Sequence, residues 1–198
     1  LCKCKELGVT PYDFYMACYN ILLSKYSGNE DVCVGVPSSG RSSKYLNTWG
    51  MFVNMLSLRN QPIGTKTFKV FVNEVKNKSF EAISHQNYSQ QELIKKLNYK
   101  KTLYDVMFIY QSEKMTHAVL GDKKAELLPI TISTSRTSLS FTILPREEDI
   151  VLMAEYRTDL FKEETINKLI EAYQLILAQC LEETKQIKDI TVLSEEEK

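Results

Sequence analysis

The segment from Trp49 to Arg59, WGMFVNMLSLR, constrains the fold more than any other part of this 198-residue chain. Its side chains alternate as a strand requires, with positions 52, 54, 56 and 58 on one face and 51, 53 and 55 on the other. Both faces are mostly apolar, and a strand of that kind is usually covered on both sides. Gly50–Arg59 is therefore predicted to be a strand buried on both faces.

One polar residue, Asn54, falls inside this apolar segment. A buried amide without hydrogen-bond partners costs about 1–3 kcal/mol, so the side chain is expected to have definite partners. Two interpretations follow. Asn54 pins a neighbouring loop, or it shapes a site at the edge of the sheet.

The rest of the chain alternates between helical and extended patterns. Thr10, Pro11 and Asp13 are typical of a helix start, because they supply a cap, a proline at the first position and an acidic first turn. This order predicts an α/β fold with helices packed on a mixed sheet. Helices are expected at 11–27, 68–83, 93–97 and 166–181, strands at 31–36 (stopped by Pro37), 106–110, 116–120, 126–133, 138–144 and 149–157, and a loop at 38–48.

Composition narrows the class of protein. Lys and Arg number 25, as do Asp and Glu, so no excess of positive charge indicates nucleic-acid binding. No apolar stretch approaches the length of a membrane span, and no signal peptide is recognised. The five cysteines are an odd number and favour a reducing cytoplasm. Cys2 and Cys4 lack the second pair that a metal site of this kind needs, so no metal is expected.

Several stretches together resemble condensation domains of nonribosomal peptide synthetases. Residues 49–59 resemble "IGxFVNTLxLR", and VGVPSSGR at 34–41 resembles "VGxPxxGR". HQNY at 85–88 resembles the start of "HQDYPFExLV", LYDVMF at 103–108 resembles "PLFDVMF", and YRTDLF at 156–161 resembles "YxTDLF". One stretch departs from the pattern: Thr137 and Ser138 stand where the family has Phe and Asp in "S(K/R)FDL".

The resemblance implies one lobe of a chloramphenicol-acetyltransferase-like (CoA-dependent acyltransferase) fold. Residues 1–186 would be the C-terminal lobe, and 187–198 the start of a linker towards an adenylation domain. The family's catalytic HHxxxDG motif is absent, because the two histidines, His85 and His117, lie 32 positions apart. The motif belongs to the other lobe, and the first residue is Leu1, so we expect a piece of a longer protein that is inactive alone.

The resemblance also suggests where a substrate tunnel or floor loop would lie. The candidates are Arg41, Gly50, Asn54, Ser135 and Arg136, and the structural motif residues are His85, Gln86, Tyr88, Asp105 and Phe108. No catalytic residue is assigned. Arg41 is expected to pair with a carboxylate or with main-chain carbonyls. His85 is interpreted as a capping or packing residue, His117 as an exposed residue of a strand, and Asp105 as a structural hydrogen-bonding residue. The Ser-rich loop at 38–43 lacks the GxxxxGK[ST] pattern of a nucleotide site.

The implied partners are the N-terminal lobe of the same domain, peptidyl carrier domains and an adenylation domain. Phosphopantetheine would be carried by the carrier domains, and no cofactor would bind this chain directly. Neither nucleic acid nor membrane is an expected partner, and the expected location is the cytoplasm. Three alternatives stay open: an epimerisation or cyclisation domain, a degenerate recruiting domain, and a free-standing interaction module with no catalytic parent.

Overall fold

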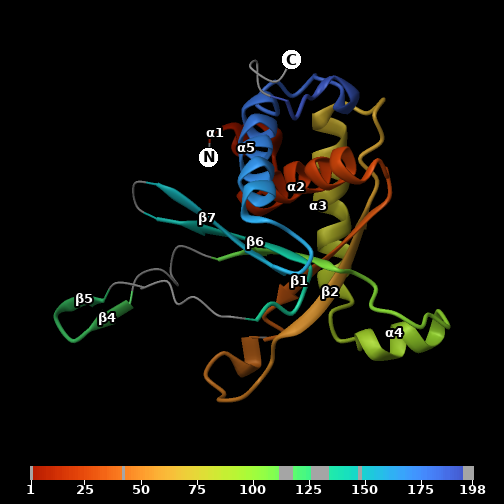
Figure 1. The fold of residues 1–198 in the computed structure, drawn as a ribbon. Helices are drawn as coiled ribbons and strands as arrows, with labels where there is room; N and C mark the ends of the chain where they lie inside the picture. The colour runs from red at the N-terminus through yellow and green to blue at the C-terminus, as the bar shows by residue number, and fades with distance from the viewer. Residues whose placement is uncertain (1, 42, 112–117, 126–133, 147–148, 194–198) are drawn as a thin grey trace.

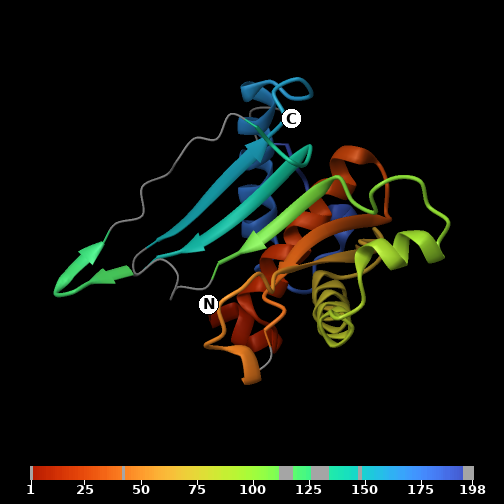
Figure 2. The ribbon, with the colours of Figure 1, turned by 90° about the horizontal axis from the view of Figure 1, so that it is seen from below.

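A computed structural model describes residues 2–41, 43–111, 118–125, 134–146 and 149–193. Its main element is a five-stranded mixed sheet with the order β2-β1-β3-β6-β7, and helices α2, α3 and α5 pack on one face (Figures 1 and 2). The prediction of an α/β fold is confirmed. The elements are α1 (Cys2–Leu7), α2 (Pro11–Ser27), β1 (Val32–Ser38), η1 (Ser43–Tyr45), β2 (Asn54–Asn60), α3 (Phe68–Ser84), α4 (Gln90–Lys96), β3 (Val106–Tyr110), β4 (Ala118–Leu120), β5 (Lys123–Ala125), β6 (Leu139–Pro145), β7 (Ile150–Tyr156), α5 (Glu163–Gln179) and η3 (Ile187–Asp189).

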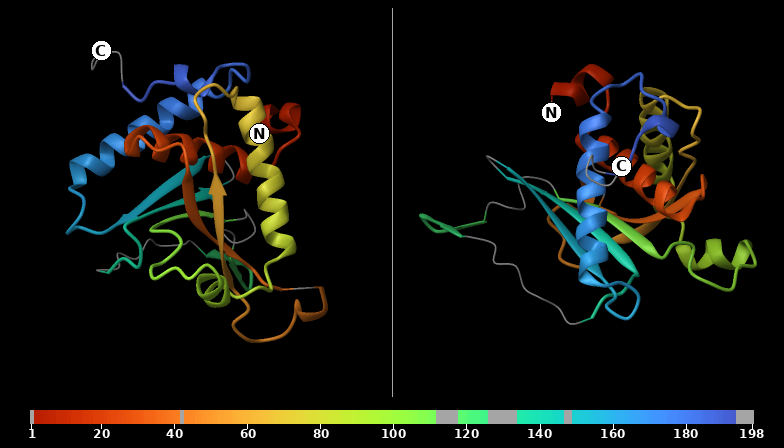
Figure 3. Two further views of the ribbon diagram at one scale, coloured as in Figure 1. Left: turned by 90° about the vertical axis from the view of Figure 1, so that its right-hand side faces the viewer. Right: turned by 45° about the horizontal axis from the view of Figure 1, so that its top comes forward.

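Strand directions fix which ends of the strands share an edge. β1 and β3 are parallel, as are β3 and β6, whereas β2 and β7 run antiparallel to their neighbours at the two edges. The carboxyl ends of β1, β3 and β6 therefore lie at one end of the sheet. β4 and β5 form a separate hairpin that stands away from the main sheet (Figures 1 and 3).

Helix α2 begins where its sequence predicts. The Thr10 hydroxyl accepts a hydrogen bond from the Asp13 amide at 3.2 Å, and the Asp13 carboxylate accepts one from the Thr10 amide at 2.9 Å. This reciprocal pair is a capping box, which satisfies two amides that the first turn leaves free. The helix ends at Gly28, whose left-handed φ of 68° suits a C-cap.

An aromatic cluster forms the centre of the core between the helices and the sheet. The ring of Tyr19 on α2 lies 5.5 Å from Phe108 on β3 and 5.0 Å from Phe141 on β6, and Tyr173 on α5 lies 5.5 Å from Phe141. All four side chains are fully buried. The Tyr173 hydroxyl donates to the Tyr15 carbonyl at 2.9 Å, so the polar end of that ring is satisfied.

The strand predicted over Gly50–Arg59 is shorter than expected and is not buried on both faces. It begins at Asn54, and Met51, before it, is 92% exposed. Leu56 and Leu58 are buried, whereas Met55 and Ser57 on the other face are only half-buried. The two-sided prediction is wrong because the helices cover one face of this edge strand and the apolar residues before it belong to a projecting loop.

One further expectation, that Pro37 stops the first strand, differs from the structure. β1 continues through Pro37 to Ser38, because its partner β2 continues opposite it as far as Asn54. The pairing of β1 with β3 is recorded only at Gly35, so the missing amide of Pro37 interrupts no bond on that side. The strand predicted at 126–133, and His117, lie outside the described residues.

The segment after α5 returns to the core. Ile187 and Ile190 are buried, and the Ile187 amide donates to the Lys66 carbonyl at 2.9 Å. The first residues of the predicted linker therefore pack against the start of α3, while the boundary at residue 186 stays a prediction. In the described part of the chain, no helix is long and apolar enough to cross a bilayer.

Candidate functional site

Residues 40, 41 and 43–52, here called the Arg41 loop, close around one guanidinium at the carboxyl end of β1. The Arg41 side chain donates to the carbonyls of Tyr45 at 3.0 Å, Thr48 at 2.5 Å and Gly50 at 3.0 Å. The central carbon of the guanidinium, Cζ, also lies 4.3 Å from the centre of the Phe52 ring. Of the two partners expected for Arg41, the structure shows main-chain carbonyls. One side chain thus fixes the course of the loop.

Glycine is required at the start of this loop. Gly40 has a left-handed φ of 61°, and a Cβ there would lie 1.9 Å from the Phe52 carbonyl oxygen. The loop projects beyond the end of the sheet (Figure 1, orange) and exposes a group of large apolar side chains at its tip. These are Leu46 (66% exposed), Trp49 (98%) and Met51 (92%).

Asn54 joins three segments beside the Arg41 loop. Its amide nitrogen donates to the Gln86 carbonyl, and its amide oxygen accepts from the Met55 amide at 2.9 Å. The Gln86 side chain in turn accepts from the Ser38 hydroxyl at 2.5 Å. The predicted partners of Asn54 exist, and the contacts match the loop-pinning interpretation, since they tie the α3–α4 connection to the ends of β1 and β2.

The other residues of the HQNY motif occupy this connection. His85 is the exposed C-cap residue of α3, and its amide donates to the Glu81 and Ala82 carbonyls. This position agrees with the capping interpretation. Tyr88 is partly exposed, with the Lys96 ammonium 5.3 Å from its ring centre.

Asp105 and Ser138 form a separate polar contact at the opposite end of the sheet. The Ser138 hydroxyl donates to the Asp105 carboxylate, and the Ser138 amide donates to the Asp105 carbonyl at 2.9 Å. Asp105 therefore makes the structural hydrogen bond predicted for it. Ser135 donates to the Thr137 carbonyl at 2.7 Å, and Arg136 is exposed.

The predicted site residues thus fall into two groups. Ser135 and Arg136 precede β6, whereas Arg41 follows β1, and these strands run in the same direction through β3. The two groups lie at opposite ends of the strands. Phe108, in the middle of β3, is a core residue. The structure brings Arg41, Gly50 and Asn54 together with Gln86, and does not bring Ser135 or Arg136 to them.

A cavity of about 450 Å³ opens beside the Arg41 loop, between α2, α3 and the sheet. Sequence patterns pointed to Arg41 and Gln86 in its lining but missed Tyr12 and Ser79. A small polar residue on the apolar stripe of α3 was the available signal for Ser79. The residues that line it are Tyr12, Val36, Pro37, Ser38, Ser39, Arg41, Leu56, Leu58, Ser79, Ile83, Gln86, Phe108 and Tyr110.

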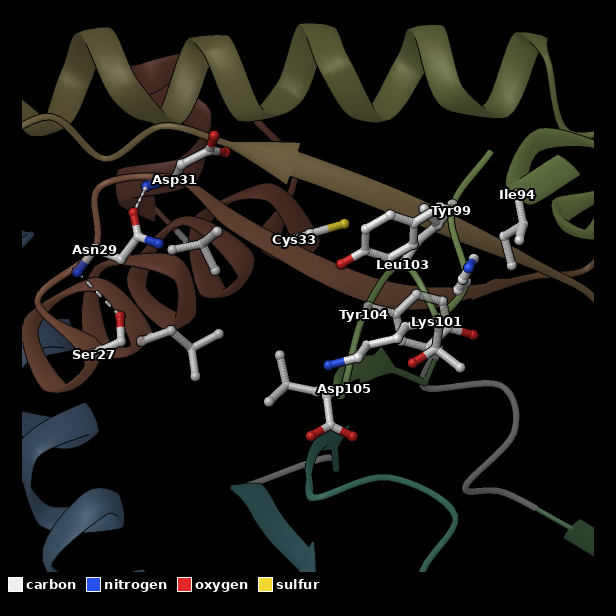
Figure 4. A pocket seen from close by; sticks show the side chains of 15 residues that line it. Ser27, Asn29, Asp31, Cys33, Ile94, Tyr99, Lys101, Leu103, Tyr104 and Asp105 are labelled. Atoms are coloured by element: carbon white, nitrogen blue, oxygen red, sulfur yellow. Dashed lines mark hydrogen bonds between the residues drawn. The ribbon is translucent and has the colours of Figure 1, made fainter. Parts of the chain in front are cut away.

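A second, more open hollow of about 1000 Å³ lies at the amino ends of β1 and β3 (Figure 4). Tyr104 crosses β1 there, and a Cβ on Gly35 would lie 2.2 Å from its ring. Burial raises the pKa of the Cys33 thiol, so this cysteine is not activated as a nucleophile. Among the described residues, no group of three His, Cys, Asp or Glu side chains is placed to hold a metal ion.

Comparison with known proteins shows what the chain as a whole is similar to. A family model described as "Condensation domain" matches residues 3–198. Gramicidin S synthase 2 of Brevibacillus brevis is 38% identical over 209 residues, an alignment that covers 98% of this chain and 4% of that protein. The chain thus spans a small part of this curated relative.

Two examples illustrate the solved structures that share the fold. The first condensation domain of the calcium-dependent antibiotic synthetase, in complex with a substrate analogue, superposes with a TM-score of 0.81 at 18% identity, covering 97% of this chain and 43% of that chain. A four-domain nonribosomal peptide synthetase bound to AMP and glycine gives a TM-score of 0.88 at 16% identity, covering 98% of this chain and 16% of that chain. At these identities the likeness concerns the fold alone.

Proposed function

This chain belongs to the condensation-domain family, and we propose that it is the C-terminal lobe of a condensation domain in a nonribosomal peptide synthetase. The observation that carries the proposal is how much of each chain aligns with the other. Nearly the whole chain, 97%, aligns with 43% of a solved condensation domain. One lobe of a two-lobed domain has that proportion.

The parent domain would join an upstream acyl thioester to the amine of a downstream aminoacyl thioester. The amine attacks the thioester carbonyl, a C–N bond forms, the C–S bond breaks, and the upstream carrier's thiol leaves. Both substrates would ride on phosphopantetheine arms of carrier domains. This lobe would supply a wall and the Arg41 loop as part of the floor, and the catalytic His would come from the other lobe.

The remaining partners follow from the same proposal. Residues 187–198 would lead towards an adenylation domain, and the packing of Ile187 and Ile190 on the lobe supports a fixed point of departure. A cytoplasmic location is part of this proposal.

Reconstitution from two polypeptides tests the proposal. We expect the 198-residue chain alone to form no dipeptide from loaded carrier proteins, and the chain mixed with the N-terminal lobe of its own synthetase to form it. The control is the same N-terminal lobe with the second His of HHxxxDG replaced by Ala, which should yield no product. Dipeptide formation by the chain alone, or a natural gene with no such lobe upstream, contradicts the proposal.

A second candidate is a degenerate relative that recruits partners without catalysis. Thr137 and Ser138, which replace Phe and Asp of the family pattern, favour it, and both are buried. Under this candidate the two lobes associate but no dipeptide forms, even with an intact HHxxxDG motif. The same reconstitution therefore separates the two functions.

A further inference from the structure

We propose that the cavity between α2 and α3 is a subsite for an uncharged substrate side chain with a hydrogen-bonding end, and that Ser79 and Tyr12 set this preference. The inference rests on the proposed function, since it names the part of an aminoacyl substrate that would enter the lobe. It concerns binding, so it can be tested apart from amide formation.

The shape of the cavity suits a side chain that is apolar along its length. Its volume of about 450 Å³ falls in the range of small-molecule pockets. Leu56 and Leu58 from β2, Phe108 from β3 and Ile83 from α3 supply apolar walls. Ser38, Arg41 and Gln86 also line it, so the cavity adjoins the site already described.

One wall carries a buried hydroxyl that no hydrogen bond of ordinary geometry satisfies. Ser79 is 5% exposed, and its oxygen has no hydrogen-bond partner of ordinary geometry among the described residues. Burial raises the pKa of the Tyr12 phenol, and the neighbouring Ser79 hydroxyl lowers it by less. Tyr12 therefore stays protonated, and the two hydroxyls offer both donors and acceptors to a group that enters the cavity.

Charge at the cavity excludes an ionised side chain. Arg41 is the only charged residue among the described residues that line it. Its guanidinium already donates hydrogen bonds to three carbonyls and lies over the Phe52 ring. A cation would find no carboxylate, and an anion no free positive charge. An amide, an alcohol or a phenol matches what remains, and a site that bonds such a group rejects an analogue that lacks it.

Binding of two probes of similar size tests this preference. N-acetylglutamine amide carries the polar end and N-acetylleucine amide lacks it, and each is titrated into the isotopically labelled 198-residue chain by NMR. We expect shifts at Ser79, Ile83 and Gln86, with the glutamine probe binding about tenfold more tightly. Ser79→Ala should reduce the difference to about threefold or less, and Tyr12→Phe should act in the same direction.

The matched control is Ser84→Ala, the same change on the same helix. The Ser84 hydroxyl is exposed and donates to the Glu81 carbonyl, so its loss should leave the preference unchanged. Tyr12→Phe keeps the test decisive if Ser79→Ala does not fold. Equal binding of the two probes, an undiminished preference in the folded variants, or no shift at the cavity overturns the inference; the last result would mean that water alone fills it.

The two proposals can fail separately. A preference that depends on Ser79, together with no dipeptide in the reconstitution, would remove the proposed catalysis and keep the subsite. Dipeptide formation without such a preference would do the reverse.

Discussion

The aromatic cluster and the Arg41 loop hold the chain together in opposite ways. In the cluster, four fully buried rings from α2, β3, β6 and α5 meet edge to face or tilted. In the loop, one guanidinium donates hydrogen bonds to three carbonyls, while Trp49 and Met51 remain exposed. The cluster is stabilised by burial of apolar surface, which is strong and does not depend on the direction of each contact. The loop uses a few directional bonds, which fix a shape and add little to global stability.

The two regions therefore tolerate different kinds of substitution. A core ring contributes to the free energy of unfolding of the whole lobe, because its burial is shared by several elements. A partly exposed arginine contributes to local order instead, since water can replace its bonds at modest cost. Three measurements test this contrast.

The largest effect is expected in the cluster. Phe141→Ala removes a fully buried ring and should lower the free energy of unfolding by about 3–5 kcal/mol, measured by urea denaturation. Phe80→Ala is the matched control, because Phe80 is 77% exposed and its loss should change stability by about 0.5 kcal/mol or less. Similar losses in the two variants would show that the cluster is not the centre of stability.

A second measurement titrates the two tyrosines of the cluster and the neighbouring Tyr15, whose carbonyl accepts from Tyr173. Burial raises the pKa of Tyr19 and Tyr173 well above the ordinary value, and raises that of Tyr15 to about 12. Above about pH 10 the unfolded chain loses phenol protons that the folded lobe keeps, so stability must fall as pH rises. We expect a loss of about 1.4 kcal/mol or less per pH unit for each such tyrosine between about pH 10 and 12.

The expected loss of stability is checked by measuring the midpoint of urea denaturation at several pH values. Phenolate absorbance is recorded in the same samples. A midpoint that does not move between pH 8 and 11 would contradict burial of these phenols. Tyr19→Phe is the control, since it should reduce the pH dependence.

The smallest global effect is expected in the loop. Arg41→Lys keeps the charge, but a compact ammonium takes the place of a planar group that has five donors. The three carbonyls can then no longer all accept a hydrogen bond from this side chain. We expect a change of about 1 kcal/mol or less in unfolding free energy, together with a clear drop in Trp49 fluorescence anisotropy. Because the chain contains a single Trp, the signal reports this loop alone.

Arg136→Lys provides the comparison, since Arg136 is exposed and lies outside the loop. Unchanged anisotropy in Arg41→Lys would mean that the guanidinium does not hold the loop. A loss of stability as large as that of Phe141→Ala would remove the contrast between the two regions.

Much of the fold was predictable because the responsible signals are local. Thr10, Pro11 and Asp13 specify the start of α2 through bonds within one turn, and the structure shows those bonds. The start of β2 was not predictable in the same way. Alternating apolar residues indicate a strand, but they do not say whether the residues before Asn54 are covered, and here Met51 is exposed.

The candidate site was predictable only in part. The sequence indicated that Arg41 and Asn54 need partners, but the choice between a carboxylate and a carbonyl depends on how the chain returns through Thr48 and Gly50. The partner of Asn54, Gln86, lies 32 positions further along the chain. The cavity wall was missed because Tyr12 and Ser79 meet only after α2 and α3 pack.

The strand order also has a kinetic consequence. β6 and β7 follow each other in the chain and can pair early, whereas β1 reaches β3 across about 70 positions, at Gly35 and Met107. Contacts between distant positions are slow to form, because closing a long loop costs entropy before any contact compensates for it. The rate of folding of the lobe should therefore depend on the arrival of β3 beside β1, where the Tyr104 ring covers Gly35.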